Sequence, residues 1–142
     1  LTSNHGWDTQ MHFAKLTAII QRFKNVGIRV SVFVDPDPVM VEYAAKAGAD
    51  RVELYTGPYA ELYDENPTAA IEMYRAAAEK AHELGIGLNA GHDLNLRNLN
   101  AFVSAFPWVD EVSIGQALIA DALYLGIQET IKQYKYALSN SN

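Results

Sequence analysis

Cysteine is absent from this chain of 142 residues. Its absence excludes disulfide bonds, thiolate metal sites and a cysteine nucleophile, and it fits a reducing compartment. No apolar stretch approaches the roughly 20 residues that a membrane-spanning helix needs, and no segment has the pattern of a secretory signal. We therefore expect a cytoplasmic protein with no membrane partner.

Positive charge is also scarce, because 11 lysines and arginines stand against 17 aspartates and glutamates, for a formal net charge of -6. This composition argues against nucleic acid or an anionic membrane as a partner. An anionic small substrate remains compatible with it, because a local site can be positive inside an acidic protein. Hydrophobic residues make up 49% of the chain and charged residues 20%, which is typical of a globular protein, and the length favours one domain.

Four short apolar runs, each followed by a turn and a helical stretch, organise the chain. The runs are apolar at most positions, as in parallel strands that are covered on both faces. We predict strands at residues 28–34, 51–55, 86–89 and 111–114, and helices at residues 11–23, 39–47, 68–84, 96–105 and 117–137. The polar tail, residues 138–142, is predicted to fray.

The alternation of strands and helices predicts βα units with right-handed crossovers, and therefore an α/β fold. Two architectures remain open at this point, an open doubly wound sheet and a (β/α)8 TIM barrel. A complete barrel typically needs about 250 residues, so four units correspond to half a barrel. Both architectures bind ligands at the carboxyl ends of their strands, so the expected place of the site is the same in either.

Two carboxylates lie at or near the predicted strand ends. Asp35 follows the first strand in "VDPDP", where a turn or helix-capping role is expected. Glu53 lies inside the second strand, between Val52 and Leu54. A carboxylate buried there needs a partner or a raised pKa. Glu53 is therefore either half of a structural ion pair or a general acid or base.

A histidine, His92, lies in the turn "NAGHD" after the third strand. Histidine titrates near neutral pH and can transfer protons there, whereas the alternative is a surface histidine without a role. The other three histidines, His5, His12 and His82, are predicted to be solvated or packed.

The fourth strand ends in "SIGQAL", where Gly115 and Gln116 precede a helix. Glycine allows a close approach of the backbone, and a helix N-terminus favours an anion, although such a sequence is also ordinary connection chemistry. Residues 56–67 are long for a βα loop and contain Tyr59 and Tyr63, so we predict a lid over a substrate or a contact with a neighbouring subunit. No metal-ligand spacing, P-loop or dinucleotide fingerprint is present, and we expect no metal and no cofactor.

The segments "RVSVFVDPDP", "RVELYTGPYA", "GLNAGHDLNLRNL" and "EVSIGQALIADALYLG" together resemble the pyridoxine 5′-phosphate synthase family. The resemblance is collinear and runs from the first residue to about residue 134. It implies a (β/α)8 barrel, of which this chain holds the fifth to eighth βα units, in a homo-oligomer that is usually an octamer. It implies condensation of 1-deoxy-D-xylulose 5-phosphate with 3-amino-2-oxopropyl phosphate to pyridoxine 5′-phosphate, phosphate and water, with no metal or organic cofactor.

The resemblance also implies roles for individual residues. His92 matches a histidine assigned as a proton donor, and Glu53 matches an acidic residue that faces the barrel interior. Contacts to the phosphates of the two substrates fall on Thr2, Asp93, Gly115 and Gln116. The family usually has histidine where this chain has Gln116, and an amide cannot carry a positive charge or shuttle a proton.

Other readings remain. One is another phosphosugar-binding barrel enzyme, an isomerase or a lyase, although a Schiff-base aldolase would need a lysine at a strand end and no lysine lies in the four runs. Another is a non-catalytic fragment that retains only the phosphate site. Because the first half of the family's barrel has no counterpart here, we expect the 142 residues to be a piece of a longer or cleaved chain, inactive alone.

Overall fold

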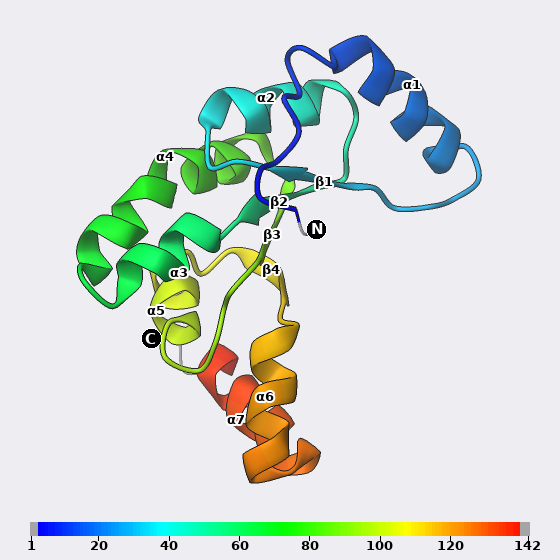
Figure 1. Ribbon diagram of the computed structural model, residues 1–142. Coiled ribbons are helices and arrows are strands. Elements are labelled where there is room, and N and C mark those ends of the chain that lie inside the picture. Colours follow the sequence, from blue (N-terminus) through cyan, green and yellow to red (C-terminus); the bar gives the residue numbers. More distant parts are fainter. Residues whose placement is uncertain (1–2, 140–142) are drawn as a thin grey trace.

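The computed structural model describes residues 3–139 and has an α/β fold (Figure 1). Seven helices and four strands are described in these residues. In chain order they are α1 (Phe13–Lys24), β1 (Ser31–Val34), α2 (Pro38–Lys46), β2 (Arg51–Tyr55), α3 (Gly57–Tyr63), α4 (Pro67–Leu84), β3 (Gly87–Gly91), α5 (Leu99–Ala105), β4 (Val109–Ser113), α6 (Gln116–Leu125) and α7 (Ile127–Ser139). Within the same residues, no helix combines the length and apolar character that a bilayer crossing requires.

The four strands form one parallel sheet in the order β1-β2-β3-β4. Each strand lies beside its neighbour in the chain, with Phe33 paired to Glu53 and Glu53 to Asn89. Because all strands run the same way, their carboxyl ends share one edge of the sheet. The residues that follow the strands therefore meet there, as the sequence predicts.

Helices cover one face of this sheet. Alternate strand residues are buried, and Figure 1 shows α2, α3 and α4 on the same side of the strands. The buried face consists of Val32, Val34, Val52, Leu54, Leu88 and Ala90. The other face carries Phe33, Glu53 and Glu111 and is partly exposed. The prediction of strands covered on both faces is wrong for the described residues, and so is a doubly wound arrangement, which would place helices on both sides.

An ion pair bridges the uncovered face of the sheet. Arg29, just before β1, binds Glu111 of β4 with Nη2 2.9 Å from Oε1. This pair connects the two ends of the strand order across the polar face. Between them, Arg51 of β2 donates to Asn89 of β3, with Nη1 2.9 Å from Oδ1. Asn89 in turn donates to Glu111 over 3.1 Å.

Proline and capping residues start the helices that follow β1 and precede β3. Asp37 caps α2, because its carboxylate accepts a hydrogen bond from the N–H of Val39. Asn66 caps α4 in the same way. Pro38 and Pro67 occupy the first helical turns, where a missing N–H costs nothing. The cap after β1 is therefore Asp37, and the prediction that Asp35 serves as the cap is wrong.

The predicted lid is a helix of the core. Residues 57–63 form α3, and its Tyr59 is fully buried and donates from its hydroxyl to the carbonyl of Asn98 over 2.7 Å. A side chain fixed in this way inside its own chain does not move as part of a lid. Contact of this segment with a neighbouring subunit stays a prediction. The single helix predicted at residues 117–137 is instead two, because Gly126 adopts φ 78° and ψ 146° between α6 and α7.

Aromatic rings fill the core between α3, α4 and α5. Phe102 lies with its ring centroid 5.0 Å from that of Tyr59, 5.5 Å from that of Tyr74 and 5.1 Å from that of Phe106. All four side chains are fully buried. Edge-to-face packing of this kind adds to the free energy gained by burial.

We expect Phe102→Ala to lower the free energy of unfolding by about 3–5 kcal/mol, because it opens a cavity at the centre of this cluster. Urea denaturation followed by circular dichroism measures the loss. Tyr124→Ala is the matched control, since Tyr124 is 91% exposed, and its effect should stay within about 0.5 kcal/mol. Equal losses in the two variants would contradict the assignment of the core.

Candidate active site

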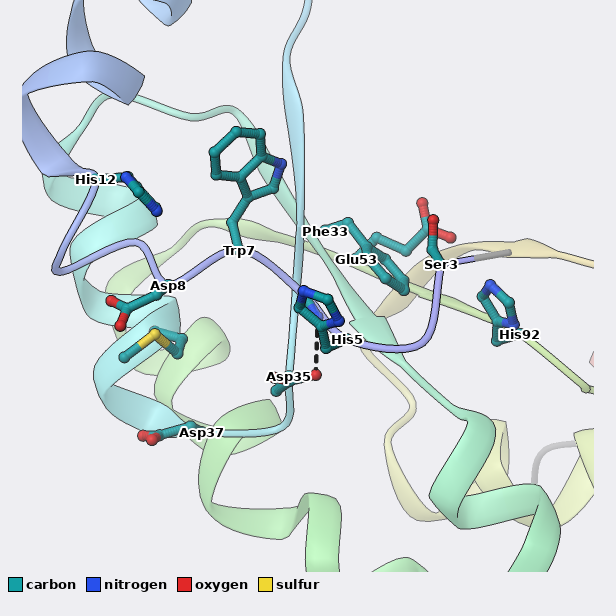
Figure 2. Close-up of a pocket in the computed structure, with 12 residues that line it drawn as sticks. Ser3, His5, Trp7, Asp8, His12, Phe33, Asp35, Asp37, Glu53 and His92 are labelled. Carbon is teal, nitrogen blue, oxygen red and sulfur yellow. Dashed lines mark hydrogen bonds between the residues drawn. The ribbon is translucent and has the colours of Figure 1, made fainter. Parts of the chain in front are cut away.

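A pocket lies at the carboxyl edge of the sheet, between the N-terminal segment and β1, β2 and β3 (Figure 2). Its volume is about 850 Å³. The lining residues are Ser3, His5, Gly6, Trp7, Asp8, His12, Phe33, Asp35, Asp37, Met40, Glu53 and His92. Figure 2 shows Glu53 and His92 at one end of the pocket and Asp8 and His12 at the other. The two predicted catalytic residues therefore share one cavity.

The N-terminal segment is fixed against the end of β1. The N–H of Gly6 donates to Oδ1 of Asp35 over 2.9 Å, and the N–H of Trp7 donates to the carbonyl of Phe33 over 2.8 Å. A Cβ atom on Gly6 would collide with the backbone of Val34. Glycine is thus required for this close approach, and Asp35 holds the segment that forms one wall of the pocket.

Glu53 points onto the uncovered face of the sheet, beside the end of β3. The space that its carboxylate fills exists because Gly91 has no side chain, since a Cβ there would collide with Oε1 of Glu53. The same Cβ would lie 3.0 Å from Cβ of Ser113, so β4 closes the other side of this space. The carboxylate of Glu53 consequently sits next to the residue that precedes His92.

His92 has an unfavourable backbone conformation. Its φ is 98°, and that of Asp93 is 57°, in the left-handed region that residues other than glycine rarely adopt. The hydroxyl of Thr56 donates to the carbonyl of His92 over 2.6 Å. The imidazole packs edge-on against the ring of Tyr55, with centroids 5.0 Å apart, and is 27% exposed. Strain of this kind is concentrated at functional sites.

This arrangement is suited to proton transfer. An imidazole and a carboxylate from neighbouring strands reach the same cavity, and both are open to a ligand. The described lining includes three histidines and four carboxylates but no lysine or arginine. Among residues 3–139, no group of three or more histidine, aspartate or glutamate side chains is arranged to hold a metal ion.

Two histidines of the pocket wall were not predicted as site residues. Oδ1 of Asn4 accepts a hydrogen bond from Nδ1 of His5 over 2.8 Å. His12 packs edge-on against Trp7 with ring centroids 5.5 Å apart. Both precede α1 and do not follow a predicted strand, which was the signal used to predict site residues. The one signal was the cluster of two histidines, a glycine and a tryptophan before the first helix. The prediction for His82 is confirmed, since its ring stacks on Trp108 at 4.7 Å.

A second pocket, of about 420 Å³, is lined in part by Asp93, the residue next to His92. The structure brings the predicted phosphate-binding residues Asp93, Gly115 and Gln116 together in its lining. Gly115 is the N-cap of α6, so the first N–H groups of this helix have no side-chain cap. Glu61 also lines this pocket and adds negative charge. The fourth predicted contact, Thr2, lies outside the described residues.

Comparison with protein families is consistent with this geometry. The model of the family described as "Pyridoxal phosphate biosynthesis protein PdxJ" matches residues 1–140. The chain belongs to the PdxJ family. The match covers both pockets and all the described elements, so the uncovered face of the sheet and its carboxyl edge are parts of a PdxJ chain.

Curated relatives carry the name pyridoxine 5′-phosphate synthase. The proteins of Bacteroides fragilis and Bacteroides thetaiotaomicron are 61% and 62% identical to this chain over 138 residues. That of Cytophaga hutchinsonii is 61% identical over 134 residues. The matches cover 94–97% of this chain but 56–58% of the relatives, so the chain spans little more than half their length.

One solved structure shares the arrangement of elements. It is the crystal structure of the Amycolatopsis orientalis BexX/CysO complex, with a TM-score of 0.50 and 15% sequence identity. The alignment covers 87% of this chain and 51% of that one. At this identity the likeness concerns the fold alone. The fold of this PdxJ chain thus corresponds to about half of that longer solved chain.

Alanine is ordinarily more stabilising than glycine, but the backbone strain at His92 predicts the opposite order at this position. We expect His92→Gly to be more stable than His92→Ala by about 1–2 kcal/mol, because both lose the imidazole but glycine alone adopts φ 98° without strain. Thermal or urea denaturation of the two variants measures the difference. At Glu79, on the exposed side of α4, alanine should be the better residue by about 0.5–1 kcal/mol. A more stable His92→Ala would contradict the strained conformation.

Proposed function

We propose that this chain is part of a pyridoxine 5′-phosphate synthase, an enzyme of the transferase class. It would condense 1-deoxy-D-xylulose 5-phosphate with 3-amino-2-oxopropyl phosphate to pyridoxine 5′-phosphate, phosphate and water. One observation carries the proposal: in a PdxJ chain, Glu53 and His92 line the same cavity at the carboxyl edge of the sheet. The name shared by relatives about 61% identical supports it.

The same proposal assigns the chain to the second half of a (β/α)8 barrel, units five to eight, within one domain. Two features support this assignment: the sheet is parallel, and α2, α3 and α4 lie on one face and leave the polar face uncovered. In the described residues β1 and β4 each pair with one strand only, which leaves a place for a neighbour at both edges. The relatives contain enough further chain to supply four more units.

His92 and Glu53 would carry the proton transfers. The amine of one substrate attacks the ketone of the other, water and phosphate leave, a proton is removed from carbon, and the ring closes. Each step moves a proton near neutral pH, which suits an imidazole with a carboxylate nearby. His92 would act as the proton donor, and Glu53 would serve as its carboxylate partner in the same cavity.

The phosphate groups would bind around the second pocket and Thr2. The free N–H groups at the start of α6, with Gly115, Gln116 and the backbone of Asp93, provide donors for one phosphate. Because the described lining of the first pocket has no lysine or arginine, cationic side chains for the substrates would come from the part of the relatives that this chain does not match. Binding of two phosphorylated substrates without them is electrostatically unfavourable.

The proposal includes a cytoplasmic location and a homo-oligomeric, octameric assembly, both of which rest on the family resemblance. Exposed apolar residues of α6, Ile119 and Leu123 among them, support burial of this helix against further protein. A second candidate is a non-catalytic fragment that keeps the phosphate site. Gln116, in place of the usual histidine, and the two open sheet edges favour that candidate.

Completing the barrel tests the proposal. We expect no pyridoxine 5′-phosphate from the 142-residue chain alone, and turnover from a fusion in which the unmatched part of the Bacteroides fragilis relative completes it. Product formation is followed by liquid chromatography with mass spectrometry. Turnover by the isolated chain would contradict the half-barrel assignment, and an inactive but folded fusion would favour the non-catalytic candidate.

In the active fusion, His92→Ala should abolish ring closure, while both substrates still bind, because only the proton donor is lost. Loss of one acid–base group typically costs a factor of about 100 to 10,000. Substrate binding is measured by calorimetry and turnover by product formation. His82→Ala is the matched control, since His82 stacks on Trp108 and lies in neither pocket. Full turnover in His92→Ala would refute the proposed role.

A further inference from the structure

Thr56 holds the end of β3 with two hydrogen bonds. It directly follows β2 and is fully buried. Its N–H donates to the carbonyl of Gly91 over 2.9 Å, and its hydroxyl donates to the carbonyl of His92 over 2.6 Å. One residue therefore fixes the two consecutive peptide units from which the imidazole projects.

The hydroxyl of Thr56 does not cap the helix that begins after it. Thr56 is the N-cap of α3, where a threonine oxygen ordinarily accepts a hydrogen bond from the N–H groups of its own helix. No such bond is present at the start of α3. The hydroxyl points to β3 instead, so the helix gives up a stabilising contact and the turn at His92 gains one.

The turn at His92 needs such support. Its φ of 98° is strained for any residue with a side chain, and a strained conformation persists only where the surroundings fix it. The residue before Thr56 contributes as well. Tyr55 packs its ring against the imidazole, and its carbonyl accepts a hydrogen bond over 2.6 Å from the hydroxyl of Tyr74, which is fully buried in α4. The end of β2 is thus anchored to the core and supports His92.

We propose that Thr56 is a positioning residue that sets the orientation of the His92 imidazole in the first pocket. The inference rests on the proposed function, because the orientation matters for turnover only if His92 transfers a proton. Thr56 does not itself line the pocket, and it acts on the site through the carbonyl of His92, which does.

The kinetic test uses the completed fusion enzyme. Thr56→Val removes the hydroxyl at nearly constant volume, and kcat should fall by a factor of about 100 while KM stays the same, because a misplaced group slows the chemical step rather than binding. Thr56→Ser keeps the hydroxyl and should restore most of kcat. If valine is too crowded at this site for the enzyme to fold, Thr56→Ala replaces it in the test. Thr56→Ala lacks both the hydroxyl and the branched methyl group, and its kcat should fall in the same way.

Thr130→Val is the matched control. Thr130 is also fully buried, and its hydroxyl also donates to a backbone carbonyl, that of Gly126, over 3.0 Å. It lies in α7, in neither pocket, so its substitution should reduce stability and leave kcat unchanged. Equal losses of kcat in the two valine variants would overturn the proposal, because the effect would then be one of stability alone.

A second measurement on the 142-residue chain does not depend on catalysis. NMR of the His92 imidazole should show one set of signals in the native chain and in Thr56→Ser, and shifted or multiple signals in Thr56→Val. Unchanged imidazole signals in Thr56→Val would overturn the proposal. An inactive wild-type fusion would contradict the proposed function alone, and the NMR comparison would then decide the role of Thr56.

Discussion

The parallel pairing of β2 with β3 is the interaction on which the candidate site depends. Its register places Glu53 opposite Asn89 and Tyr55 opposite Gly91. The carboxylate of Glu53 can then lie beside Gly91, and the residue after Tyr55 can reach the carbonyl of His92. A shift of one residue would turn Glu53 towards the buried apolar face and separate these groups. The position of Glu53 relative to His92 is therefore set by the register of the sheet.

The sequence predicted the strand positions and the edge of the sheet at which their carboxyl ends meet, because short apolar runs between glycine-containing turns are a local signal. The predicted second strand coincides with β2, and the third is β3 within two residues at either end. That Asp93, Gly115 and Gln116 share a pocket also followed, since they come after neighbouring parallel strands. The α/β class and the family needed no tertiary information.

Other features depended on contacts between distant segments. Residues 57–63 contain Gly57 and Pro58 and resemble a loop, yet they form α3 because Tyr59 fits into the aromatic core. The apolar pattern continues across Gly126, and only its backbone conformation separates α6 from α7. The pocket wall formed by residues 3–12 depends on the bond from Gly6 to Asp35, 29 residues away. No local pattern encodes a contact of that length.

The turn at His92 and Asp93 contributes to two cavities. His92 lines the larger of them and Asp93 the smaller, although the two residues are adjacent in the chain. The peptide unit that joins them is planar and rigid, so a rotation of the backbone at this turn moves both residues. A change in the conformation of the turn would therefore alter the walls of both cavities together.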